Sequence, residues 1–217
     1  MNKPLQSGAV LLLCLLLLMA LSLLGLAAAS DSQLQQRVSG NLQHRLDVDF
    51  TAQQALAWAE AWLMSLPGES RPVPCSESCS NSQVIRPAGY FSNESLTMNE
   101  SWWQSHGIPS GFAPDRGMNF PVATAPGNLS AYWLVEQAHL EEWADPENHI
   151  TELAWYRLTA MAGDSEGSFH VKQGIVARPW GEPSYRNTLP ERASAHHFCD
   201  VLAPDIPCGR KAWQPLN

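Results

Sequence analysis

One short stretch of the chain has the spacing of a hydrolase nucleophile. Residues 163–167 read Gly-Asp-Ser-Glu-Gly, which matches the G-x-S-x-G elbow that exposes a catalytic serine between a strand and a helix. His196 or His197 would be its general base. The segments on both sides, however, resemble strands, and the one that follows has no helical stripe. A glycine-bearing link between two strands is typical of a β-hairpin, so the glycines predict a turn and not an esterase.

The histidines near the C-terminal end are the second candidate for chemistry. Residues 196–199 read His-His-Phe-Cys, and imidazole and thiolate are common zinc ligands. Zinc sites favour a C-x2-C spacing, which the chain lacks. The simpler interpretation is a pair of surface histidines beside an oxidised cysteine, with no metal and no cofactor.

The cysteines themselves favour disulfides. Cys14 lies inside an apolar stretch, where we expect it to be inert. The other four form two short pairs, Cys75 with Cys79 and Cys199 with Cys208. Local pairing is favoured, although four cysteines allow three pairings. Disulfides indicate an oxidising compartment outside the cytoplasm.

The composition limits the partners that the chain can have. It contains 13 basic and 21 acidic residues, and all of these except Lys3 follow residue 30, so the later part carries a formal charge of −9. An acidic body without a basic block argues against binding nucleic acid directly. The tryptophans could form platforms for a ligand, but they are scattered and more simply fill a core. They lie at positions 58, 62, 102, 103, 133, 143, 155, 180 and 213.

The element that must position the rest of the chain is a long helix that begins near the N-terminus. Residues 9–29 are apolar and uncharged, and as a helix they would span about 31 Å, the thickness of a bilayer core. Lys3 precedes them and Asp31 follows them, which predicts a single membrane span with its N-terminus in the cytoplasm. The alternative is a secretory signal cleaved after the alanines 27–29, which would release the rest of the chain.

The helical pattern continues beyond the predicted membrane span. Residues 30–66 are amphipathic, with an apolar residue every third or fourth position and no proline before Pro67. A helix from Ala9 to Ser65 would be about 85 Å long. Its first half needs lipid or similar helices around it, whereas its second half needs a globular cover. This continuation argues against a cleaved signal.

The remainder predicts an α+β fold, in which the long helix packs on a small antiparallel β-sheet. Residues 67–130 are rich in Pro, Ser, Gly and Asn and indicate a long loop-rich connection, in which partner contacts would lie. Residues 131–180 have the composition of three antiparallel strands. The tail, residues 181–217, is expected to be irregular and closed by a disulfide.

The N-terminal third resembles the type IV pilin class of precursors, and most closely the PilX-type minor pilins. Residues 7–11 (SGAVL) resemble their short leader that ends in glycine. Residues 37–42 (RVSGNL), Arg45, residues 50–56 (FTAQQAL) and residues 59–60 (AE) are similar to the family's signature after the membrane segment. A weaker likeness to its three C-terminal strands lies in residues 131–136, 155–160 and 173–176.

The resemblance implies a processing route and a set of partners. Residues 1–8 would be a leader that a prepilin peptidase removes between Gly8 and Ala9, followed by methylation of the Ala9 amine. The chain would then wait in the inner membrane, with its head in the periplasm, before joining the pilus at the cell surface. It would be a low-copy structural component and not an enzyme. Its partners would be other minor pilins, the major pilin, the inner-membrane assembly platform and a tip adhesin.

One position departs from the family's pattern. Most pilins have a glutamate at the fifth mature residue, which here is Leu13, and no acidic residue precedes Asp31. A carboxylate at that depth in the membrane is costly and is explained by pairing with the free amine of a neighbouring subunit. Its absence suits a subunit that starts or tips the filament, although Leu13 is equally well an ordinary lipid-facing leucine.

Two other interpretations stay open at the level of sequence. A minor pseudopilin of type II secretion shares the pilin architecture, and its tip-associated member also lacks the acidic residue. A secreted or membrane-anchored domain that binds a ligand through its tryptophans is the alternative from another class.

Overall fold

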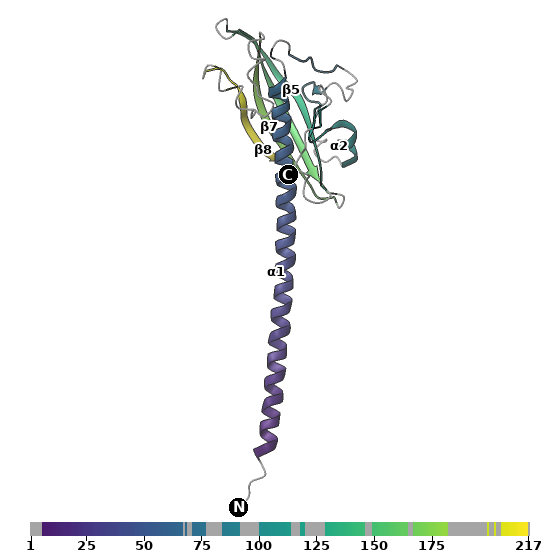
Figure 1. The fold of residues 1–217 in the computed structure, drawn as a ribbon, viewed down its shortest axis with the longest axis vertical. Coiled ribbons are helices and arrows are strands. Elements are labelled where there is room, and N and C mark those ends of the chain that lie inside the picture. Colours follow the sequence, from purple (N-terminus) through teal and green to yellow (C-terminus); the bar gives the residue numbers. More distant parts are fainter. Residues whose placement is uncertain are drawn as a thin grey trace, which may run out of the picture. The chain divides into compact units, whose positions relative to one another are not determined.

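The fold is described by a computed structural model. It describes residues 6–66, 68, 71–76, 84–91, 100–113, 118–119, 129–145, 149–164, 167–181, 199, 202 and 205–216. The chain forms two compact units, Met1–Leu46 and Asp47–Asn217. Helix α1, Gln6–Ser65, begins in the first unit and ends in the second (Figure 1). We call the second unit the head.

The length of α1 follows from its composition. Leucine, alanine and glutamine dominate it, and no proline lies between Pro4 and Pro67, so nothing in its interior removes a backbone donor. Two serines in the apolar part bond back to their own helix: Ser22 Oγ donates to the Leu18 carbonyl over 2.7 Å, and Ser30 Oγ donates to that of Ala27 over 2.8 Å. These bonds satisfy hydroxyls that would otherwise face an apolar environment.

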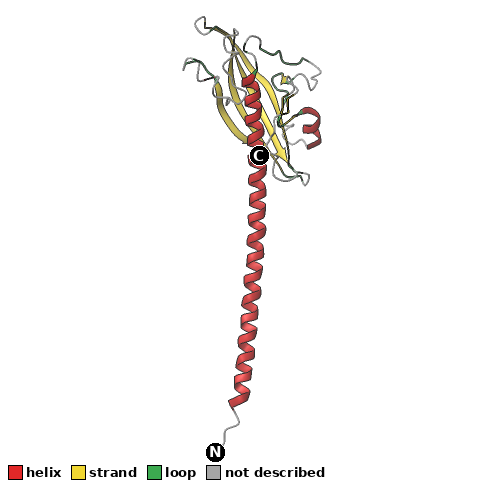
Figure 2. Ribbon diagram, in the orientation of Figure 1, coloured by secondary structure: helices red, strands yellow, loops and turns green. Residues whose placement is uncertain are grey.

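The head contains a six-stranded mixed sheet. Its long strands are β5 (Ser130–Asp145), β6 (Ile150–Gly163) and β7 (Phe169–Gly181), which pair antiparallel in chain order. Strand β8 (Gly209–Leu216) pairs antiparallel with β7 and is at one end of the sheet. Beside β5 lie the short strands β1 (Ile85–Arg86), which runs parallel to it, and β2 (Ile108–Pro109), which runs antiparallel. Figure 2 shows these strands behind the last turns of α1.

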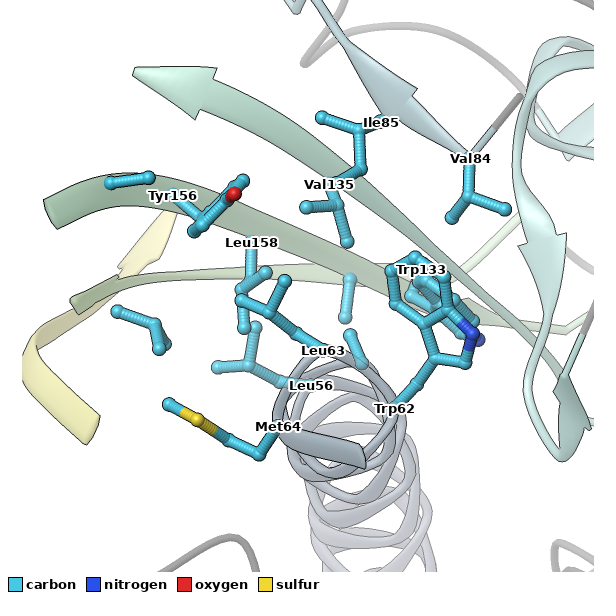
Figure 3. Close-up of a cluster of buried hydrophobic side chains, with 14 of the residues drawn as sticks. Leu56, Trp62, Leu63, Met64, Val84, Ile85, Trp133, Val135, Tyr156 and Leu158 are labelled. Carbon is cyan, nitrogen blue, oxygen red and sulfur yellow. The ribbon is translucent and has the colours of Figure 1, made fainter. Parts of the chain in front are cut away.

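The prediction of an α+β fold with a long helix on a sheet is confirmed. The last five turns of α1 cover one sheet face, where Ala52, Ala55 and Ala59 are completely buried. Small side chains let the helix approach the strands closely. Larger ones fill the space around them: Leu56, Trp62 and Leu63 from α1 meet Trp133, Val135, Tyr156 and Leu158 from β5 and β6 (Figure 3).

The loop-rich region of residues 67–130 contains a few short elements: helix α2 (Glu100–His106), β1, β2 and a hairpin of β3 (Phe112–Ala113) and β4 (Met118–Asn119). Elements this short show no periodicity in the sequence. The tail is not irregular throughout, because β8 extends the sheet; its proline and charged residues fit an edge strand, where a missing amide is tolerated. Parallel β1 makes the sheet mixed and not purely antiparallel.

Candidate assembly surfaces

The first candidate surface is the apolar half of α1. Its large apolar side chains from Val10 to Leu26 are 55–73% exposed in the single chain. This is the one helix, among the described residues, that is long and apolar enough to cross a membrane. The chain is therefore suited to anchoring in a membrane by its N-terminal helix. Gly8 and Ala9 lie within α1. Leu13 is 60% exposed, so this position presents an aliphatic side chain.

The second candidate surface follows directly after the first in the sequence. We call residues 30–46 the neck. Four of its apolar residues, Leu34, Val38, Leu42 and Leu46, are 58–67% exposed. The sequence analysis expected a globular domain to cover the amphipathic half of the helix. This cover is only partly present, because burial begins at Val48 and the apolar residues before it are exposed within the described chain. Periodicity identified the stripe, but it could not say how far the sheet reaches along it.

Two ion pairs join one flank of α1 to strands β7 and β8. Glu60, only 2% exposed, accepts from Arg210 of β8, whose Nε lies 2.7 Å from the Glu60 Oε2. Asp49 accepts from Lys172 Nζ of β7 over 2.8 Å and lies 3.6 Å from His170 Nδ1. Asp49 and Glu60 are about 20° apart around the helix at 100° per residue. This flank is therefore acidic and the strands that face it are basic, which sets how the helix lies on the sheet.

The end of α1 is held by an arginine that the sequence analysis did not identify. Arg178 of β7 is completely buried, donates to the Leu66 carbonyl, and stacks with its guanidinium 3.8 Å from the centre of the Trp180 ring. A cation beside the last carbonyls of a helix is favoured by the helix dipole. Tyr156 lies in the same buried region, and its burial raises the pKa of the phenol to about 12, against the opposing effect of Arg178.

A third candidate surface is the sheet face away from α1. Here Glu136 of β5 is 1% exposed, and its Oε1 accepts the Phe91 amide over 2.8 Å. Burial raises the pKa of this carboxyl, although the Phe91 amide and Arg157, 3.9 Å away, lower it in part. Arg86 of β1 is the register partner of Glu136 and is equally buried. Its guanidinium donates to the His106 carbonyl over 3.4 Å.

Aromatic side chains complete this face. Trp103 of α2 is fully buried against Leu134, Met161 and Val171 of the sheet, with Phe91 beside it. Trp102 is half-buried and stacks on His106, with ring centres 4.6 Å apart. Residues 67–130, where partner contacts were expected, therefore contribute Phe91, Trp102 and Trp103 to a packed aromatic cluster. Its adjacent tryptophans differ in burial but contact each other edge to face.

The segment that matches the esterase motif lies between β6 and β7. Residues 164–168 link β6 to β7, with the Asp164 amide donating to the Ser168 carbonyl over 3.0 Å and Gly167 at a φ of +94°. The predicted hairpin is thus confirmed, with strands on both sides. Ser165, His196 and His197 lie outside the described residues. Among the residues that are described, no group of three potential ligands is placed to hold a metal ion.

The cysteines lie partly within the described structure. Cys199 and Cys208 form a disulfide with their Cα atoms 5.4 Å apart, in agreement with their short spacing. Leu202 and Ile206, which lie between the two cysteines in the sequence, are buried and belong to the same core cluster as residues of α1. Cys75 is disulfide-bonded, and its expected partner Cys79 lies outside the described residues. Cys14 is a free, exposed thiol.

Most of the tryptophans belong to the interior. Trp62, Trp103, Trp133 and Trp180 are at most 6% exposed, whereas Trp213 on β8 is 61% exposed. The other four are half-buried. This distribution does not favour a ligand platform built from several aromatic rings.

Comparisons with known proteins give no relative for this chain. No protein-family model, no curated protein and no solved structure matches it. Any assignment of function therefore depends on the residues and contacts described above.

Proposed function

We propose that the chain is a PilX-type minor pilin, a low-copy component that initiates or tips a type IV pilus. The observation that carries this proposal is helix α1. The exposed apolar segment that suits a bilayer and the segment that forms the core of the head belong to one helix, Gln6–Ser65. A subunit with this design can wait in the membrane and later pack its apolar half among similar helices.

The features at the start of the helix support the same proposal. Gly8 precedes the apolar residues directly, as the resemblance to pilin precursors requires. Leu13 leaves the subunit without a carboxylate in the membrane to pair with a neighbour's free amine. A subunit at the starting end has no earlier neighbour to pair with, so this loss is tolerable there. A structural role, with no reaction catalysed, follows from the proposal.

The mature N-terminus tests this function. Mass spectrometry of the chain, isolated from cells that contain a prepilin peptidase, should find a product that begins at N-methylated Ala9. Gly8→Arg should block this cleavage, whereas Ala29→Arg should not. A product that begins at Ser30, and whose formation Ala29→Arg blocks, would overturn the proposal in favour of a secreted domain.

Deletion of the gene distinguishes a subunit of a pilus from a subunit of a secretion system. We expect loss of surface pili, with secretion of folded proteins unchanged. Loss of secretion with normal pili would instead identify a minor pseudopilin. This second candidate is kept because Leu13 fits it equally well.

A further inference from the structure

We draw no further inference here: the strongest candidate, the row of exposed apolar side chains Leu34, Val38, Leu42 and Leu46 on the neck of α1, carries none because nothing in the described part of the structure shows what covers it.

Discussion

Arg210 of β8 forms an ion pair with Glu60 of α1, although the two residues are 150 positions apart in the sequence. Both bonds from the guanidinium reach the same oxygen, Oε2, and the Glu60 side chain is 2% exposed, against 26% for Arg210. The pair fastens the edge strand to the helix. Because a buried charge without its partner is strongly unfavourable, this contact has a clear consequence for stability.

Removal of the arginine should destabilise the head more than removal of the whole pair. We expect Arg210→Met to lower the free energy of unfolding by about 3 kcal/mol, because the Glu60 carboxylate is left buried without a cation. The double variant Glu60→Met/Arg210→Met should recover most of this loss. Urea unfolding of the full chain in detergent, followed by tryptophan fluorescence, measures both.

The neighbouring residue provides the control for this pair. Lys211 is exposed on the same strand, and Lys211→Met should change the free energy of unfolding by no more than about 0.5 kcal/mol. A double variant as unstable as Arg210→Met alone would contradict the assigned role of the pair.

Glu136 should make the stability of the head depend on pH. Burial raises the pKa of its carboxyl above the ordinary value near 4.5. At pH values between the ordinary and the raised pKa, the folded state therefore holds a proton that the unfolded state has released. The contribution of Glu136 to stability is therefore fully present below that ordinary value and is lost as the pH rises through the folded-state pKa. Glu136→Gln keeps an oxygen for the Phe91 amide and should remove this part of the pH dependence.

The comparison requires unfolding curves at several pH values above 4.5. The difference in stability between Glu136→Gln and the native chain should grow in favour of the variant as the pH rises. If the difference in stability between Glu136→Gln and the native chain were constant across the pH range, the Glu136 carboxyl would have the same pKa in the folded and unfolded states, which would contradict this prediction.

Gly181, the last residue of β7, lies close to the backbone of His149, which directly precedes β6. A β-carbon at this position would clash with the His149 carbonyl oxygen, and backbone cannot move aside as a flexible side chain does. We expect Gly181→Ala to destabilise the head by about 2 kcal/mol or more. Gly174→Ala is the matched control in the same strand, because its β-carbon would meet the nearest atoms at 3.5–3.6 Å. Equal stability of the two variants, from thermal unfolding, would disprove this close approach.

A charge in the middle of the apolar half should interfere with the proposed assembly. Leu17 is 55% exposed in the apolar half of α1, and an aspartate at mid-membrane costs about 3 kcal/mol on insertion scales. Leu17→Asp should therefore reduce membrane retention and abolish piliation, as measured by fractionation and electron microscopy. Gln36→Asp, in the neck, should still be retained in the membrane. Normal piliation by Leu17→Asp would contradict the model of assembly through this helix.

Much of the fold could be predicted from the sequence because its largest elements obey local rules. Helix α1 depends on the spacing of apolar residues and on the lack of proline up to Pro67, and both are visible in the sequence. The β6–β7 hairpin depends on glycines between two strand-like runs. The short elements α2 and β1 could not be predicted, because their stability comes from packing of Trp103 and from pairing with β5 and not from a periodic pattern.

Of the candidate surfaces, only the apolar half of α1 and its processing site were predictable from the sequence. Composition identified residues 9–29 as a possible span, and the resemblance pointed to Gly8 and Ala9 as a processing site. The buried glutamates gave no comparable signal. Glu60 lies at the flank of a helical stripe and Glu136 lies in an alternating strand, so each looks like an ordinary surface acid until its environment is known.

The sequence by itself determined that the chain has a long N-terminal helix, apolar first and amphipathic later, followed by strands, because these properties depend on neighbours within a few positions. The tertiary structure decided which of those residues are covered. It buried Val48 and left Leu46 exposed, and it brought Arg210 to Glu60 and Phe91 to Glu136. Such outcomes depend on which distant segments meet when the sheet closes on the helix, and no local pattern records that.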